Sequence, residues 1–216
     1  MILRLLLLSL LFFSSSFLQG KDLFEQALKA SVAKDYPKAY TLMKKAARKG
    51  DVRAQVNVAL MYEFGNGVAV DYAKAKYWYE QAAKKGDPKG LYNLGRLYEE
   101  GKGVALNLKE AIRWYTKAGK RGSQEAQFRL ATLYAEGRLG APDPSRAAYW
   151  YKIAADAGNA EAQYRLGLML ATGKGIKLNK IAAYQYWIRA ARQSHVKAQE
   201  GLDRLCKASP WACRPY

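Results

Sequence analysis

The sequence predicts an all-α fold, a right-handed α-solenoid built from antiparallel helix pairs. Two observations predict it. Many residue columns recur without a gap when the chain is shifted by 36 positions against itself, and such self-similarity is the signature of a repeat architecture. Within each block, apolar residues recur three or four positions apart in two separate stretches, which is the spacing of one helix face. Each block therefore contributes two helices, here called A and B, and neighbouring blocks bury a shared core.

Residues 1–20 are predicted to be a secretory signal peptide outside the fold. Arg4 precedes a run of apolar residues, and the small residues Ser14, Ser15, Ser16 and Gly20 follow it. This is the order of a basic start, a short apolar middle and a cleavage region. A retained membrane anchor is the alternative, but the apolar run is shorter than the ~20 residues that span a bilayer. We expect an exported protein, periplasmic or secreted.

Residues 21–50 are expected to form an entry helix pair. One apolar face begins at Leu23 and Phe24, and a second face includes Leu42 and Met43. The short turn 34–37 joins them and lacks the glycine loop found in the later blocks. This segment therefore differs from the blocks that follow it.

Four full repeats follow, at 51–86, 87–122, 123–158 and 159–194. Each helix is bounded by residues suited to a helix end: side chains that accept hydrogen bonds at the start, and glycine at the end of helix B. Helix A begins at Asp51, Asp87, Ser123 and Asn159; helix B begins at Asp71, Asn107, Asp143 and Asn179; and helix B closes at Gly86, Gly122 and Gly158, with Gly50 closing the entry pair.

Residues 195–216 are predicted to be a capping helix with a tail. His195 to Lys207 continues the pattern of helix A, and no helix B follows. Cys206 and Cys213 are expected to form a disulfide in an exported chain, which would hold the tail over the last helix. The alternatives are a redox pair or part of a metal site, but the Cys-x-x-Cys spacing or further ligands that these need are absent.

The repeat pattern resembles the SEL-1-like repeat family. The clearest copy is DPKGLYNLGRLYEEGKGVALNLKEAIRWYTKAGKRG, residues 87–122. Two copies depart from the pattern: the third has Gly137-Arg138-Leu139-Gly140 in place of Gly-x-Gly, and the fourth has Tyr186-Trp187 in place of Trp-Tyr. The entry pair looks more like a tetratricopeptide repeat, a related family. The resemblance also implies a bacterial source, since the family is abundant there.

No catalytic, cofactor or metal site is expected. One histidine and two cysteines leave little material for such chemistry. The Gly-x-Gly segments join two helices and lack the longer spacing of a phosphate-binding loop, so they are interpreted as turns. Cysteine-rich bacterial members of the family are associated with β-lactam hydrolysis. This chain lacks their cysteine pair in every repeat, which disfavours that third hypothesis.

Function is instead expected from a surface. Stacked helix pairs curve, and their A helices line a concave face. Ligands of the similar tetratricopeptide arrays contact fixed A-helix positions. Carried to this sequence, these positions give the predicted partner-binding residues: Arg53, Asn57, Lys89, Tyr92, Asn93, Arg96, Phe128, Arg129, Tyr164 and Arg165. Such aromatic, amide and guanidinium groups suit an extended peptide. The alternatives are that Tyr92, Phe128 and Tyr164 only pack between A helices, and that Arg129 and Arg165 are solvated helix charges.

The net charge of +18 favours an anionic partner. Many of the cations fall near the ends of the B helices, where the helix dipole stabilises them without a ligand. We therefore expect a monomeric, non-enzymatic scaffold that binds an acidic protein or peptide on its concave face. A basic binder of an anionic envelope polymer or membrane surface is the alternative. Nucleic acid is not expected as a partner, because the chain is expected to be exported.

Overall fold

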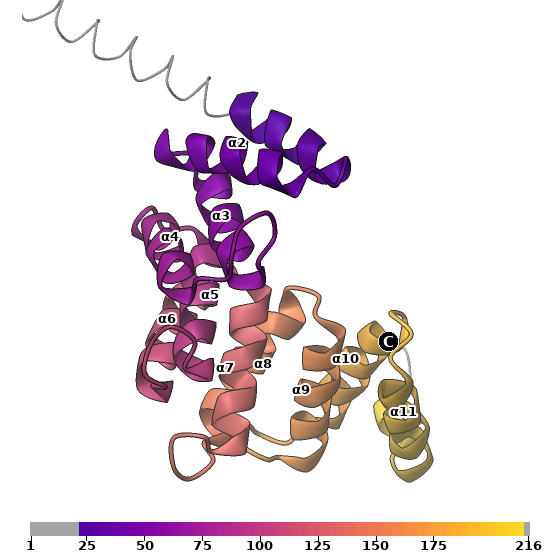
Figure 1. The fold of residues 1–216 in the computed structure, drawn as a ribbon. Helices are drawn as coiled ribbons and strands as arrows, with labels where there is room; N and C mark the ends of the chain where they lie inside the picture. The colour runs from indigo at the N-terminus through magenta and orange to yellow at the C-terminus, as the bar shows by residue number, and fades with distance from the viewer. Residues whose placement is uncertain (1–21, 214–216) are drawn as a thin grey trace, which may run out of the picture. The chain divides into compact units, whose positions relative to one another are not determined.

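The computed structural model describes residues 22–213, so the expected signal peptide lies outside the described residues. Within that range the regular elements are helical, which confirms the predicted all-α class (Figure 1). A first helix covers residues 22–32. It is followed by α2 (Tyr36–Arg48), α3 (Val52–Phe64), α4 (Tyr72–Lys84), α5 (Pro88–Glu100), α6 (Leu108–Lys120), α7 (Gln124–Glu136), α8 (Pro144–Asp156), α9 (Ala160–Thr172), α10 (Lys180–Ala191), α11 (Val196–Ala208) and the short 3₁₀ helix η1 (Pro210–Cys213). The A helices are α3, α5, α7, α9 and α11, and the B helices are α2, α4, α6, α8 and α10.

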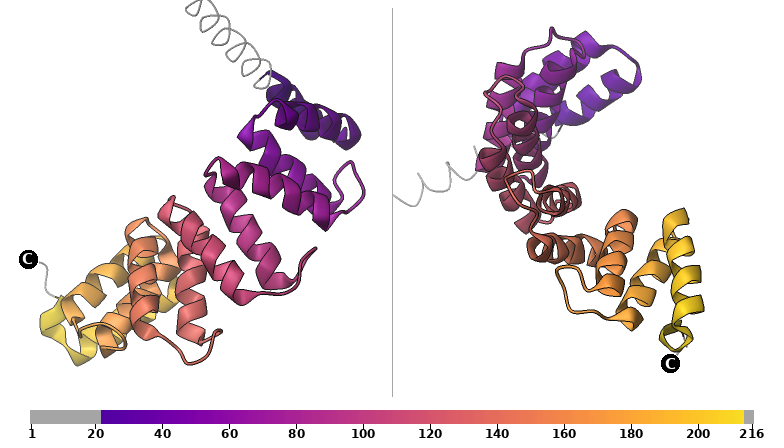
Figure 2. Two further views of the ribbon diagram at one scale, coloured as in Figure 1. Left: turned by 90° about the vertical axis from the view of Figure 1, so that its left-hand side faces the viewer. Right: turned by 90° about the horizontal axis from the view of Figure 1, so that it is seen from below.

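The chain divides into two compact units between Trp114 and Tyr115, within α6. In unit 1, α2 packs on α3, α3 on α4, and α4 on α5. In unit 2 the same order holds from α7 to α11. Figure 2 shows these consecutive helices side by side, those of unit 1 in the left view and those of unit 2 in the right view. Contacts between neighbours in sequence are what a solenoid of helix pairs requires.

The predicted helix starts and ends are confirmed. The Asp51 carboxylate accepts a hydrogen bond from the Ala54 amide at 3.1 Å, and Asp87 accepts one from Gly90 at 2.7 Å. The other six predicted N-terminal residues cap their helices in the same way: Asp71, Asn107, Ser123, Asp143, Asn159 and Asn179. The glycines that close the B helices have φ values from 78° to 99°, a left-handed conformation that glycine adopts without steric cost.

The glycine loops pack against the start of an earlier B helix. A Cβ atom on Gly103 would lie 2.6 Å from the Tyr72 side chain, and one on Gly175 would lie 2.4 Å from the Pro144 backbone. The second glycine of these loops therefore permits close backbone approach as well as a positive φ. The loop of the third repeat follows a different path, with its second left-handed residue at Gly140 rather than at position 139.

The aromatic columns pack into the core. Trp78 and Trp150 are buried. In the fourth repeat Trp187 takes the buried position that Tyr79 and Tyr151 hold in other copies, and its ring lies against Gly167 and Gly201. The Tyr186-Trp187 departure thus places the larger ring where two glycines make room for it.

Buried glutamines, which the sequence analysis did not single out, join each A helix to the B helix before it. The side-chain amides of Gln55, Gln127 and Gln163 donate to backbone carbonyls eight residues earlier, at 2.9–3.2 Å. These carbonyls lie at the ends of B helices, where the amide four residues later no longer continues the helix. Each also accepts a hydrogen bond from the amide of the glycine that closes the helix, so the glutamine is its second donor. The second repeat has Leu91 at this position and cannot make the bond.

The C-terminal segment forms the predicted helix and disulfide. Cys206 and Cys213 are bonded, with their Cα atoms 5.6 Å apart. Lys180 also donates to the Ser209 hydroxyl at 2.8 Å, which links the tail to α10. The tail therefore lies against the last helices of unit 2.

Candidate functional site

The predicted partner-binding residues fall on the A helices of both units. Six lie on α3 and α5 in unit 1, and four lie on α7 and α9 in unit 2. The predicted partner-binding residues are therefore divided between the two units.

At the start of α3, Arg53 is held by neighbouring groups. Its guanidinium lies 3.0 Å from the Asp51 carboxylate and 4.0 Å from the centre of the Phe24 ring. Asn57 donates to the Arg53 carbonyl at 2.8 Å, within the same helix. Both side chains are already bonded, so a ligand would have to compete for them. Lys89, on α5, is exposed.

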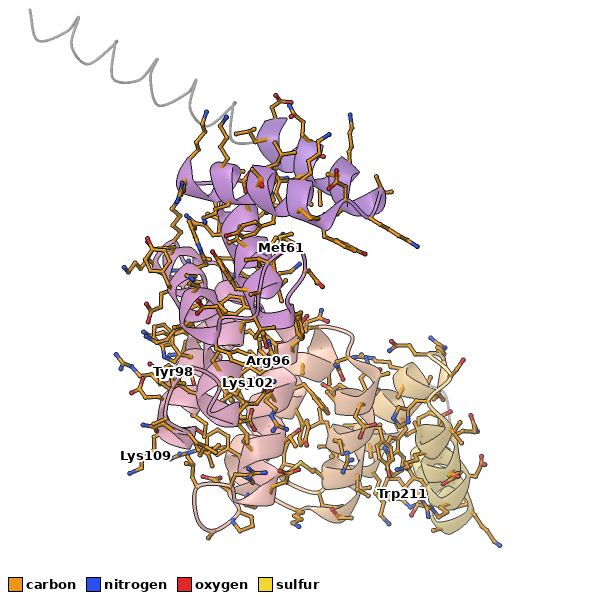
Figure 3. All side chains as sticks on the ribbon, viewed as in Figure 1. Met61, Arg96, Tyr98, Lys102, Lys109 and Trp211 are labelled. Carbon is orange, nitrogen blue, oxygen red and sulfur yellow. A yellow bond between two sulfur atoms is a disulfide. The ribbon has the colours of Figure 1, made fainter. Side chains whose placement is uncertain are left out.

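Arg96, which is labelled in Figure 3, takes part in a buried network of unit 1. It donates to Oε2 of Glu63, and the Tyr79 hydroxyl donates to the same oxygen at 2.8 Å. The Glu63 side chain is 1% exposed, and burial with the nearby carboxylate raises the pKa of Tyr79. Asn93 lies beside the network, its side-chain oxygen 3.4 Å from Arg96 Nε. The sequence predicts that Arg96 contacts a partner. In the structure, its bond to Glu63 joins the second repeat to the first.

In unit 2, Glu161 organises a cluster on α9. One of its oxygens accepts from Arg165 Nε, and the other lies 2.7 Å from His195 Nε2. His195 Nδ1 accepts from the Ala198 amide, so Nε2 carries the proton donated to Glu161. Burial favours a higher pKa for Glu161, but the hydrogen bonds from His195 and Arg165 outweigh it and lower that pKa.

The two aromatic candidates of unit 2 are partly buried. Tyr164 stacks on His195, with ring centres 4.9 Å apart, which supports the packing alternative for this residue. Phe128 contacts Tyr151 at 5.8 Å between ring centres. Tyr92 and Arg129 are also half-buried. These rings therefore contribute to packing within the array as well as to its surface.

A cavity of about 150 Å³ opens beside Arg165 in unit 2. It lies between the third and fourth repeats, where α8 and α9 meet the loops that follow α7 and α9. Its lining is mainly apolar and includes two cationic residues, Arg165 and Lys174. The lining residues are Ala135, Pro142, Pro144, Ala147, Tyr151, Arg165, Leu168, Met169, Thr172 and Lys174. An apolar cavity with a few polar groups is the usual form of a binding site.

Sequence reasoning found Arg165 but not the cavity beside it. Ala135 and Pro144 line the cavity and are smaller than Glu63 and Tyr72 at the equivalent positions of the first repeat. The pattern shared by the repeats does not reveal the cavity. A comparison of side-chain volumes at equivalent positions of the repeats could have predicted it. A second hollow, near Lys29 and Lys38 in unit 1, contains none of the predicted residues.

Basic residues collect in the last turns of several B helices, as expected: Lys45 and Arg48 in α2, Lys84 in α4, Lys117 and Lys120 in α6, and Arg189 in α10. Among residues 22–213, none of the helices has the length and apolar character needed to cross a membrane.

A family model described as Sel1 repeat matches residues 19–51, 52–87, 88–123, 124–159 and 160–195. These matches include the segment that the sequence analysis treats as an entry pair. Among curated protein sequences, none matches the chain.

Solved structures show the same architecture. A Sel1 repeat protein from Oxalobacter formigenes is 35% identical with a TM-score of 0.73, over 79% of this chain and 49% of that one. A protective antigen of uropathogenic Escherichia coli with an SLR fold is 29% identical with a TM-score of 0.80, over 91% and 42%. A structure described as a sel1 repeat protein from Klebsiella pneumoniae is 25% identical with a TM-score of 0.53, over 86% and 92%. The chain thus spans less than half the length of the first two.

Proposed function

Because this chain belongs to the Sel1 repeat family, we propose that it is an exported scaffold that binds an acidic protein or extended peptide through its A helices. Proteins of this family generally serve as scaffolds for protein–protein interactions and are typically not catalytic. The partner-binding residues are the ten A-helix side chains already placed on α3, α5, α7 and α9. A periplasmic or secreted location agrees with the Cys206–Cys213 disulfide, since such bonds persist in oxidising compartments.

The observation that carries this proposal is the combination of charge and apolar surface around Arg165. Its side chain is 48% exposed and lines the cavity of unit 2. Leu168, one turn further along α9, lines the same cavity and is 41% exposed. An exposed guanidinium beside an open apolar cavity gives an acidic peptide both an ionic contact and a place for a side chain.

The alternative is a surface that binds an anionic envelope polymer or membrane headgroups through the B helices. It is favoured by the basic last turns of those helices and by the net charge of +18. Such binding would be mainly electrostatic and would weaken strongly with salt.

A selection from a random peptide library on the purified chain tests the proposal. A face variant, Asn57→Ala/Asn93→Ala/Arg165→Ala, is expected to lose the enriched peptides. A matched outer variant, Lys45→Ala/Lys84→Ala/Lys120→Ala, is expected to keep them. Both variants remove three side chains, and the outer variant removes more positive charge, so a loss confined to the face variant is not an effect of net charge. The proposal fails if the chain enriches no peptide, or if only the outer variant loses binding. Salt-sensitive adsorption of the chain to isolated envelopes, lost only in the outer variant, would support the alternative.

A further inference from the structure

We propose that the cavity of unit 2 receives the carboxylate of a glutamate side chain from the bound partner, as unit 1 encloses the carboxylate of its own Glu63. This inference rests on the proposed function and specifies the chemistry of one contact. The chain itself supplies the comparison, because positions 72 residues apart occupy equivalent places in the two units.

The cavity exists because unit 2 lacks the side chains that fill the same place in unit 1. Ala135 stands at the position of Glu63, and Pro144 at that of Tyr72. Leu168 likewise replaces Arg96. The ion pair that closes the space in unit 1 is therefore absent, and the volume is open between the third and fourth repeats.

The tyrosine that donates a hydrogen bond to the carboxylate in unit 1 is also present in unit 2. The Tyr79 hydroxyl donates to Glu63 at 2.8 Å. Its counterpart Tyr151 lines the cavity, and its hydroxyl makes a hydrogen bond of 3.5 Å with Thr132 Oγ1. This bond is longer than the usual 2.5–3.0 Å of an O–H···O bond and is therefore weaker than the bond that Tyr79 makes. Burial raises the pKa of Tyr151, so the hydroxyl keeps its proton and remains a donor.

Unit 2 also has an arginine at this place, but it comes from a different position of the A helix than Arg96 does in unit 1. Arg165 stands at the place of Asn93, one turn before Leu168, and lines the cavity. Arg165 donates to Glu161 through Nε. Its two Nη groups are further hydrogen-bond donors of the same guanidinium. Lys174, at the position of Lys102, also lines the cavity. The site thus has an O–H donor and two cationic residues, of which Arg165 is paired with Glu161, around a space that lacks the carboxylate present in unit 1.

The size and lining of the cavity suit a glutamate side chain. A cavity of about 150 Å³ is large enough to hold benzene, which is bulkier than a propionate group. Pro142, Leu168 and Met169 provide apolar contacts for the methylene groups. Tyr151 and Arg165 would then hold the carboxylate, in the roles that Tyr79 and Arg96 have in unit 1.

The test is a titration of the purified chain with N-acetyl-L-glutamate N-methylamide, followed by the NMR signals of Arg165 Nε–H and the Tyr151 ring. The matched glutamine compound has the same shape without the charge. We expect saturable shifts with the glutamate compound and at least tenfold weaker binding of the glutamine compound, as loss of a charged hydrogen bond implies.

Three variants sharpen the test. Ala135→Glu/Leu168→Arg rebuilds the ion pair of unit 1 inside the cavity and is expected to abolish the shifts. Ala171→Glu makes the same alanine change one repeat later, outside the cavity lining, and is expected to leave them. Tyr151→Phe removes only the hydroxyl, and we expect about tenfold weaker binding; it also serves if the double variant does not fold.

Equal binding of the two compounds, no shifts at all, or full binding by Tyr151→Phe overturns the inference. Full binding by the folded double variant does the same. The scaffold function has a separate outcome: if the double variant keeps the selected peptides that the face variant loses, the glutamate contact is wrong and the peptide-binding function stands.

Discussion

Replacing Arg96 with leucine is expected to destabilise unit 1 by about 3 kcal/mol. Removing one partner of a buried ion pair costs about 3–5 kcal/mol, because the other charge stays buried without compensation. Here the remaining carboxylate belongs to Glu63, whose side chain is 1% exposed. Within the described residues its Oε1 atom already has no hydrogen-bond partner. The lower end of the range applies because Tyr79 still donates to Oε2.

Urea denaturation followed by far-UV circular dichroism measures this loss, with hydrogen exchange to locate it. Local exchange is needed because repeat arrays can unfold in parts. The double variant Glu63→Ala/Arg96→Leu introduces the pair of residues found at Ala135 and Leu168. It is expected to lose less stability than Arg96→Leu alone, since no charge is left buried. A loss below about 1 kcal/mol for Arg96→Leu would refute the reasoning. So would a loss in the double variant equal to the sum of the losses in Glu63→Ala and Arg96→Leu.

Three further predictions concern other parts of the fold. Gly175→Ala should cost about 1–3 kcal/mol more than Gly158→Ala in thermal denaturation, because both have a positive φ but only Gly175 would bring its Cβ against neighbouring backbone; equal losses would contradict the close-approach explanation. Replacing Cys206 and Cys213 with serine should cost about 2–3 kcal/mol, as the chain-entropy model gives for a short loop, and an unchanged urea midpoint would argue against it. The lowered pKa of Glu161 contributes stability that is fully present above the unfolded pKa of about 4.3 and is lost as pH falls through the lower folded pKa. Urea midpoints between pH 5 and pH 3 should therefore fall less in Glu161→Gln than in the unchanged chain, and parallel curves would be inconsistent with the bonds described for this carboxylate.

Much of the fold could be predicted from the sequence because it depends on local rules repeated at a fixed interval. Residues such as Asp51 and Asn159 cap helices through their own first turn, and Gly86 closes a helix through its own backbone conformation. These effects require little knowledge of distant contacts. The 36-residue period then places the helices in order, since each repeat contacts its neighbours.

The roles of individual surface positions were harder to predict because they depend on a residue in another repeat. Arg96 turns into the core of unit 1 because Glu63, 33 residues earlier, supplies a buried carboxylate. At the equivalent place in unit 2, Leu168 and Ala135 leave a cavity. Both sequences satisfy the same helical pattern, so periodicity alone does not distinguish an inward ion pair from an open binding cavity.

Site-specific photo-cross-linking in the source cells tests most directly whether a partner contacts the A helices. A photoreactive residue is placed at the exposed A-helix positions Lys89 and Leu168, and at the exposed B-helix positions Tyr77 and Tyr149. We predict that one acidic protein is cross-linked from both A-helix positions, with the attachment mapped by mass spectrometry, and from neither B-helix position. Cross-links to a partner from the B-helix positions alone would contradict the account.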